Sequence, residues 1–145
     1  MIRPLAKTDK QLFIEMSLEF YTSSAVCHTI PEENHTLAFD HMMEDDRYSR
    51  CYIAEQDSKA AGFMLISLTY SREAGGMAIW LEELYIRPEF QNMGLGGEFI
   101  DFIMSEYRDA KRFRLEMTHG NPAEHLYKRK GFEPFEYEQL VFDRA

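Results

Sequence analysis

The chain has 145 residues, of which 45% are hydrophobic and 14% aromatic, so it can bury the core of one domain. A formal net charge of -9, from 25 acidic and 16 basic residues, argues against nucleic acid as a partner, although acidic charge also simply keeps proteins in solution. No segment approaches the ~18 apolar residues of a membrane span, and residues 1–9 lack the apolar core of a secretory signal. We therefore expect a single cytoplasmic domain over residues 1–145, without a membrane partner.

The first half of the chain predicts a strand, two helices and a hairpin. Residues 2–6 are typical of a short strand, and apolar residues recur at helical spacing from about 9 to 22. A second helix, opened by a proline, is expected over about 31–45. The apolar stretches 51–54 and 62–70 flank a polar turn, which indicates two paired antiparallel strands.

The second half predicts three more strands and two more helices. A strand over 77–87 ends at a proline, and apolar residues on one face predict a helix over 94–107. A strand over 113–118, a short helix over 123–130 and a final strand over 137–143 follow. This order predicts an α/β fold with a mixed central sheet of about six to seven strands, flanked by about four helices.

The segment Q-N-M-G-L-G-G, residues 91–97, joins the strand over 77–87 to the helix after it. A loop without bulky side chains can turn its backbone N–H groups toward one point, and the following helix adds unpaired N–H groups and a positive dipole end. Such a segment binds phosphate. No G-K-[ST] follows and the third glycine of the dinucleotide fingerprint is missing, so the two best-known phosphate motifs do not fit. The alternative is that the glycines only begin a helix after a proline turn.

Residues 91–96 are similar to the [QR]-x-x-G-x-[GA] pyrophosphate loop of the GNAT superfamily of N-acetyltransferases. Three other segments resemble signatures of that family, in its order: I-R-P-L-A-K-T-D at the start, E-E-L-Y-I-R-P-E-F before the loop, and L-Y-K-R-K-G-F at 126–132. The resemblance covers essentially the whole chain and is most specific over 81–132. Within the superfamily, L-E-E-L-Y-I and Y-K-R-K-G resemble the branch that acetylates diamines and polyamines.

The resemblance implies a GNAT fold with acetyl-coenzyme A as co-substrate. It places the backbone of Leu84, Tyr85 and Ile86 beside the pantetheine arm. It assigns the pyrophosphate to the loop residues Gln91, Asn92, Met93, Gly94, Leu95, Gly96 and Gly97. An asparagine found in relatives falls on Gly120 here, and the neighbouring Asn121 is expected as a cofactor contact in its place.

Acetyl transfer to an amine needs a proton acceptor and a proton donor. An amine is protonated near neutral pH and must lose a proton before it attacks the thioester, while the leaving thiolate gains from a donor. The resemblance assigns the donor to Tyr127; the alternative is a tyrosine packed on its helix. It also places the first residue of the pair Glu82 and Glu83 against substrate, so Glu82 is the predicted catalytic carboxylate, unless both are solvated strand-end charges. On a regular strand the two point to opposite faces, and only a bulge would bring both into the cleft.

The segment between the first two helices corresponds to the acceptor wall of relatives, so Tyr21 and His28 join Glu82 and Glu83 as predicted substrate contacts. The histidines lack the spacing of metal ligands, and no metal is expected. The adjacent Cys27 and His28 do not indicate a covalent thiol mechanism, because neighbours in sequence rarely face each other. Two cysteines are too few for a disulfide framework and fit a reducing compartment.

The predicted activity is transfer of an acetyl group from acetyl-coenzyme A directly to a primary amine of a small cationic metabolite, of the diamine or polyamine kind. Two alternatives stay open: an acetyltransferase of peptide N-termini or lysines, and an acyl-coenzyme A-binding regulatory module without activity. The resemblance is also compatible with a homodimer, because dimers are frequent in the superfamily.

Overall fold

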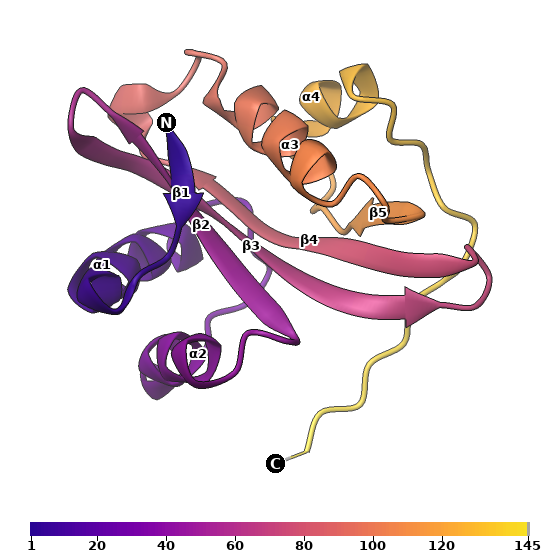
Figure 1. The fold of residues 1–145 in the computed structure, drawn as a ribbon, viewed down its shortest axis with the longest axis horizontal. Helices are drawn as coiled ribbons and strands as arrows, with labels where there is room; N and C mark the ends of the chain where they lie inside the picture. Colours follow the sequence, from indigo (N-terminus) through magenta and orange to yellow (C-terminus); the bar gives the residue numbers. More distant parts are fainter. Residues whose placement is uncertain (145) are drawn as a thin grey trace.

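A strand, two helices and three consecutive strands come first along the chain, and a helix, a strand and a last helix follow (Figure 1). This computed structural model describes residues 1–144. The elements are β1 (Ile2–Pro4), η1 (Lys7–Asp9), α1 (Lys10–Tyr21), α2 (Glu33–Glu44), β2 (Ser49–Gln56), β3 (Lys59–Ser71), β4 (Gly76–Ile86), η2 (Pro88–Phe90), α3 (Leu95–Glu106), β5 (Arg112–Leu115) and α4 (Glu124–Arg129). The four predicted helices are confirmed, each within two residues of its expected bounds.

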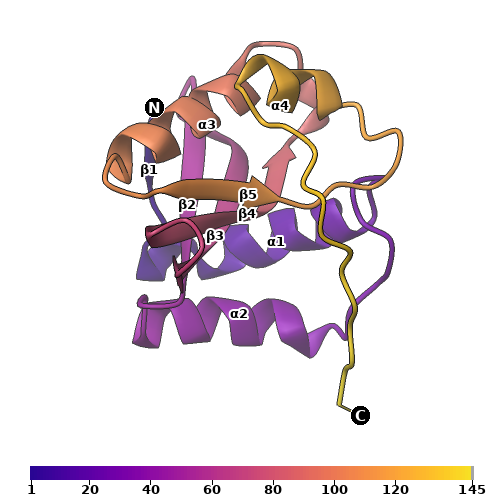
Figure 2. The same ribbon diagram turned by 90° about the vertical axis from the view of Figure 1, so that its right-hand side faces the viewer.

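The strands of the described residues form one sheet in the order β1-β2-β3-β4-β5. Neighbouring strands are antiparallel except β4 and β5, which are parallel, so the sheet is mixed as predicted. α1 and α2 cover one face of this sheet, and α3 and α4 cover the other (Figures 1 and 2). Within residues 1–144, no helix has the length and apolar character needed to span a membrane.

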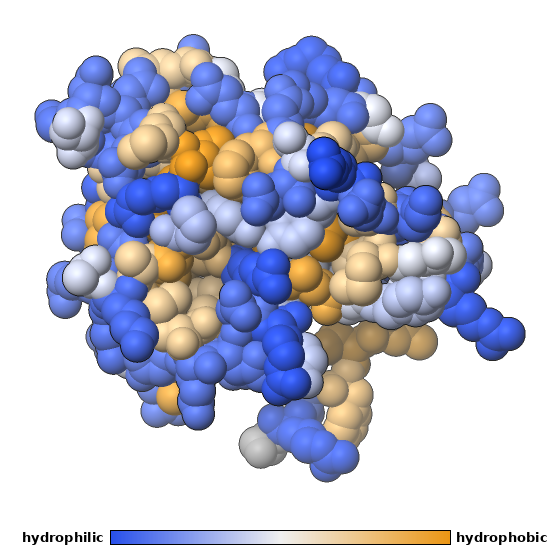
Figure 3. Space-filling view, viewed as in Figure 1, coloured by the Kyte–Doolittle hydropathy of each residue, from blue (hydrophilic) through white to orange (hydrophobic). Residues whose placement is uncertain are grey.

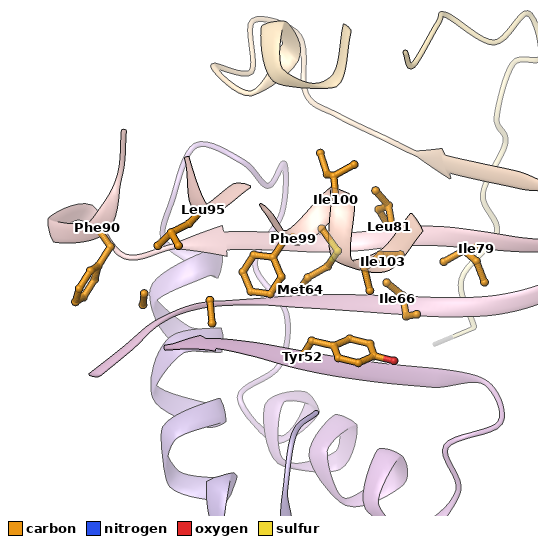
Figure 4. Packing of buried hydrophobic residues seen from close by; sticks show 12 residues of the cluster. Tyr52, Met64, Ile66, Ile79, Leu81, Phe90, Leu95, Phe99, Ile100 and Ile103 are labelled. Atoms are coloured by element: carbon orange, nitrogen blue, oxygen red, sulfur yellow. The ribbon is translucent and has the colours of Figure 1, made fainter. Parts of the chain in front are cut away.

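Two apolar clusters bury the two faces of the sheet. On one face, Ile66 and Ile79 pack with Phe99, Ile100 and Ile103 of α3, as Figure 4 shows. The buried members of the second cluster, under α1 and α2, are Leu5, Phe13, Met16, Phe20, Phe39, Met42, Cys51, Ile53, Phe63 and Tyr85. Because β4 contributes to both clusters, packing from two sides fixes its position.

The expected count of six to seven strands was too high, since the described residues form five. The strand predicted over 137–143 is not formed, and residues 133–144 carry no regular secondary structure. Its apolar side chains Leu140, Val141 and Phe142 are 97%, 83% and 86% exposed. Local pattern favours an extended backbone there, but a strand also requires a neighbour that supplies hydrogen bonds.

Candidate active site

β4 and β5 run together for a short distance and then separate. Their parallel pairing extends from Ala78 opposite Arg112 to Leu81 opposite Leu115. β4 continues to Ile86, and over this last stretch β3 alone pairs with it in the part of the chain that the structure describes. One edge of β4 is therefore open from residue 82 to residue 86.

The hydrogen-bond pattern identifies which backbone groups face this open edge. The N–H of Arg87 donates to the carbonyl of Ala61 in β3 at 2.8 Å. Because backbone groups alternate in direction along a strand, Tyr85 also turns its N–H and C=O toward β3. Leu84 and Ile86 turn theirs toward the open edge. Of the three residues expected along the pantetheine arm, Leu84 and Ile86 therefore present their backbone groups at the open edge, and Tyr85 does not.

The loop from Gln91 to Gly97 ends in the first turn of α3. Gly94 is the N-cap residue, with φ of 83° in the left-handed region, and Asn92 has φ of 63°. The first backbone bond of the helix runs from the N–H of Glu98 to the carbonyl of Gly94 at 3.0 Å. The N–H groups of residues 95–97 consequently have no acceptor within the helix. Together with the helix dipole, they form a position suited to a phosphate group.

Two side chains of this loop brace it against the strands. The Gln91 Nε2 donates to the carbonyl of Ile86 at 3.1 Å, at the end of β4. The Met93 sulfur accepts a weak hydrogen bond from the Gln56 Nε2, with a separation of 3.5 Å. The loop side chains thus hold the loop in place, and the backbone is left to meet a ligand.

Two of the glycines allow α4 to pack on α3. A Cβ on Gly96 would lie 2.9 Å from Cδ2 of Leu126, and one on Gly97 would lie 3.4 Å from Cε of Lys130. A Cβ on Gly94 would meet open space, so only its backbone angle favours glycine there. The run of glycines therefore combines a backbone turn with a close contact between helices, and only the turn was expected from sequence.

α4 carries Tyr127 and begins with the help of Asn121. The Oδ1 atom of Asn121 accepts the N–H of Ala123 at 2.8 Å, which leaves its amide nitrogen as the group for a ligand. The ring of Tyr127 meets Phe132, with 6.0 Å between centroids and planes at 65°. Burial raises the pKa of the Tyr127 phenol, so the hydroxyl keeps its proton near neutral pH and is a proton donor. It lies in the wall of a cavity of about 1100 Å³ beside β5.

A bulge brings Glu82 and Glu83 to the same face of the sheet. The pairing of β4 with β3 shifts by one residue here, and Glu82 is the extra residue. The Oε1 atom of Glu82 accepts from Oγ of Ser67 at 2.6 Å, and the Oε2 atom of Glu83 accepts from the Tyr21 hydroxyl at 2.9 Å. Ser67 is two residues from Leu65, which packs in the cluster under α1 and α2, so both carboxylates lie on that face.

The two carboxylates differ in their surroundings. Glu82 is exposed, whereas Glu83 is partly buried. Burial raises the pKa of Glu83, the hydrogen bond from Tyr21 opposes this rise, and the negative charge of Glu82 adds to it. A carboxylate with a raised pKa holds a proton more firmly than usual, which is the property of a general base that works near neutral pH.

Tyr21 is held in place by residues of both N-terminal helices. Its ring meets Phe20 edge-on at 5.3 Å and His35 of α2 edge-on at 5.4 Å. Burial, with the charge of Glu83, raises the pKa of the Tyr21 hydroxyl, which remains a donor. His35 is itself fixed by Ser17, because its Nδ1 lies 2.6 Å from the Ser17 Oγ inside the protein. Neither Ser17 nor His35 was predicted as part of the site, since only the packing of α1 on α2 brings them to Tyr21.

The loop between α1 and α2 touches the segment after β5. The Thr118 hydroxyl donates to the carbonyl of Ser24 at 3.4 Å, and His28 is exposed further along the same loop. Cys51 is buried, which raises the pKa of its thiol, whereas Cys27 is exposed. Among residues 1–144, no group of three or more His, Cys, Asp or Glu side chains is arranged to hold a metal ion.

An open edge on β4, a glycine loop at the start of α3 and a half-buried phenol on α4 together define a class of protein. Residues 47–134 match the family model described as "Acetyltransferase (GNAT) domain", and the chain belongs to this family. It is an N-acetyltransferase whose co-substrate is acetyl-coenzyme A. A comparison with curated proteins finds no match.

Solved structures share the fold at low sequence identity. A predicted acetyltransferase from Clostridium acetobutylicum with acetyl-CoA is 16% identical, with a TM-score of 0.79 over 97% of this chain and 95% of that one. A ribosomal-protein-alanine N-acetyltransferase from Brucella melitensis is 16% identical, with a TM-score of 0.75 over 99% of both chains. The aminoglycoside antibiotic 6'-N-acetyltransferase AAC(6')-IG from Acinetobacter haemolyticus is 16% identical, with a TM-score of 0.75 over 100% of this chain and 99% of that one. These similarities concern the fold, and the names of the second and third proteins give two different acceptors.

Proposed function

We propose that the chain acetylates a primary amine of a small cationic metabolite, of the diamine or polyamine kind. The observation that carries this proposal is the bulge that brings Glu82 and Glu83 to one face where β4 opens. Two carboxylates at the mouth of a cleft attract a polycation and repel an anion. The net charge of -9 on the whole chain also attracts cations.

The open edge and the loop have the groups that a coenzyme A molecule needs. The unpaired N–H groups of residues 95–97 suit a diphosphate, and the outward backbone groups of Leu84 and Ile86 suit the amides of a pantetheine arm. Asn121 and Tyr127 are also proposed as contacts of the cofactor. When bound, acetyl-coenzyme A supplies an activated acetyl thioester.

Three side chains of the protein have separate tasks in a direct transfer without a covalent enzyme intermediate. Glu83, with its raised pKa, accepts the proton of the amine, either directly or through water. Glu82 is exposed and holds the cationic remainder of the acceptor. Tyr127 keeps its proton and donates it to the leaving thiolate. In the alternative assignment Glu82 accepts the proton. Variants of the two residues distinguish these assignments.

Further properties belong to the proposal. Residues 1–145 would act as one domain, supported by the continuous sheet from β1 to β5. A cytoplasmic location is supported by Cys27 and Cys51, which are free thiols. Tyr21 and His28 would line the acceptor side, supported by the bond from Tyr21 to Glu83 and by the position of the α1–α2 loop. A homodimer is also part of the proposal, supported by the exposed apolar side chains of Leu140, Val141 and Phe142.

A screen for free coenzyme A release tests the acceptor. Diamines and polyamines are expected to give the highest kcat/KM, above aminoglycosides, single amino acids and peptides. A preference for peptides would replace the proposal with an enzyme acting on peptide N-termini or lysines. Binding of acetyl-coenzyme A with no thiol release for any amine would replace it with a regulatory module.

Glutamine variants of Glu82 and Glu83 test the separate roles of the two carboxylates. Glu83→Gln is expected to lower kcat by about 10²-fold or more, because the amine loses its proton acceptor. Glu82→Gln is expected to raise KM for polyamines and to leave KM for a monoamine nearly unchanged. Steady-state kinetics check both, with Glu89→Gln on the exposed η2 as the control. The reverse pattern would mean that Glu82, and not Glu83, accepts the proton of the amine.

A further inference from the structure

Trp80 of β4 and Arg114 of β5 lie opposite each other in the parallel pairing of these strands. The residues before and after each of them pack in the apolar cluster that includes α3. Because side chains alternate between the two faces of a sheet, Trp80 and Arg114 point to the other face, which also carries Glu82 and Glu83. The end of β3 and β4 near their hairpin turn projects past α1 and α2 (Figures 1 and 3), and both side chains are partly exposed.

Aromatic rings hold the guanidinium group of Arg114 in place. Its central carbon lies 4.0 Å from the centroid of the Trp80 ring and 5.0 Å from that of the Phe135 ring. A cation over the face of an aromatic ring is attracted by the negative charge of that face. The neighbouring Arg112 also lies 5.0 Å from the Phe135 ring, but it forms an ion pair with Glu73 at 3.0 Å. The two rings thus fix Arg114 without neutralising its positive charge.

The charge on this face changes sign along β4. Ser67 of β3 lies opposite Trp80, and its hydroxyl donates to the carboxylate of Glu82. Trp80 therefore separates Glu82, which leans toward β3, from Arg114 on β5. Trp80 precedes Glu82 by two residues, which is about 7 Å along an extended strand. From Glu83 toward the hairpin turn, the face presents two carboxylates and then an aromatic ring that a cation covers.

We propose that Arg114 restricts the acceptor to a diamine, because it repels the third positive charge of a longer polyamine. This inference rests on the proposed function. The co-substrate is proposed along residues 84–86, so the remainder of the acceptor extends along β4 in the opposite direction, toward Trp80. One amine of the acceptor then lies at Glu83 and the second at Glu82. A third ammonium group reaches the ring of Trp80 and meets the guanidinium group that already covers it.

Removal of the charge at Arg114 has two consequences that act in the same direction. The repulsion of a third ammonium group is lost, and the face of the Trp80 ring becomes free to attract that group. A neutral side chain at this position therefore turns a place that rejects a cation into one that binds it. Lysine keeps the positive charge, so Arg114→Lys retains the discrimination between a diamine and a longer polyamine.

Three acceptors test the proposal on the unmodified protein. Putrescine is a diamine, spermidine is putrescine extended by an aminopropyl group, and N-butylputrescine has a methyl group in place of the last amine of spermidine. Coenzyme A release is expected to give similar kcat/KM values for putrescine and N-butylputrescine. The value for spermidine is expected to be about five- to tenfold lower, because only spermidine brings a third charge to Arg114. A spermidine value as high as that of putrescine, or an N-butylputrescine value as low as that of spermidine, overturns the proposal.

Variants of Arg114 provide a second test. Arg114→Gln is expected to raise kcat/KM for spermidine about five- to tenfold and to leave the value for putrescine nearly unchanged, whereas Arg114→Lys is expected to change neither. The control is Arg108→Gln, which removes the same charge at an exposed position after α3 and is expected to have no effect on either value. Circular dichroism checks that the variants remain folded. An unchanged ratio of spermidine to putrescine in Arg114→Gln overturns this inference alone, whereas an unmodified protein that acetylates none of the three amines overturns the proposed function as well.

Discussion

Glu82 and Glu83 are chemically identical neighbours, yet the structure gives them different properties. Glu83 is partly buried and bonded to Tyr21, whereas Glu82 is exposed and bonded to Ser67. The difference arises from one extra residue in β4, which turns both side chains to the same face at different depths. At the scale of residues, therefore, a backbone irregularity separates the proposed proton acceptor from the proposed cation anchor.

The hydroxyl of Tyr21 is expected to set the pH range in which Glu83 works. Its hydrogen bond stabilises the charged carboxylate and so lowers the pKa of Glu83 against the effect of burial. Tyr21→Phe removes this bond, and the pKa of Glu83 rises further. A general base is active only when deprotonated, so the acidic limb of the kcat/KM profile is expected to move to higher pH.

A pH series from about 5 to 9, around the range in which such groups titrate, checks this shift. Tyr70→Phe is the matched control, because Tyr70 is 71% exposed on β3. A lower kcat/KM with an unchanged acidic limb would mean that Tyr21 only supports the structure.

The hydroxyl of Tyr127 is expected to matter for turnover, whereas its ring is expected to keep its contact with the cofactor. Tyr127→Phe keeps the ring packed against Phe132 and removes only the donor. Loss of a general acid typically lowers kcat by about 10²–10⁴-fold. Kinetics measure the loss, and titration calorimetry with coenzyme A is expected to give a nearly unchanged Kd. Unchanged turnover, with Tyr48→Phe as reference, would remove Tyr127 from this role.

At the scale of elements, the site depends on how closely α4 packs on α3. The absent side chain of Gly96 lets Leu126 approach, and Leu126 is the neighbour of Tyr127. The N–H groups at the start of α3 and the phenol on α4 are therefore held in one unit. A change at this contact should affect stability and turnover together.

Gly96→Leu is expected to destabilise the protein by about 1–3 kcal/mol, because the new side chain overlaps Leu126. The displaced α4 also moves Tyr127, so kcat is expected to fall. Urea denaturation measures the free energy of unfolding. The control is Glu98→Leu, an exposed position in the same turn of α3, where no such loss is expected. Equal effects of both substitutions would contradict the packing role.

At the scale of the whole molecule, the separation of β4 from β5 creates the place that we propose for the co-substrate. Both strands are held by buried clusters up to the point of separation, and the glycine loop stands at the end of β4. A ligand in this position touches strand, loop and helix at once. Binding should consequently stabilise the native state as a whole.

Acetyl-coenzyme A is expected to raise the melting temperature. At a concentration of about 100 times Kd, a ligand that binds only the native state adds ~2.7 kcal/mol, which corresponds to roughly 5–10 °C for a chain of this size. Differential scanning fluorimetry measures the shift. An N-acetylcysteamine thioester, which lacks the diphosphate, is expected to give almost none. Equal shifts from the two compounds would contradict a diphosphate site at the loop.

Sequence alone determined the features that depend on neighbours along the chain. The four helices follow from apolar spacing, and the unpaired N–H groups of the proposed phosphate-binding loop follow from glycines at the start of a helix, where such groups are unpaired in any fold. Tertiary structure decided what depends on distant partners. The bulge at Glu82 exists only in the register of β4 with β3, and His35 reaches Tyr21 only through the packing of α1 on α2. Residues 137–143 have the pattern of a strand, but pairing is a property of two segments, so the pattern could not reveal that the chain's own sheet provides no partner.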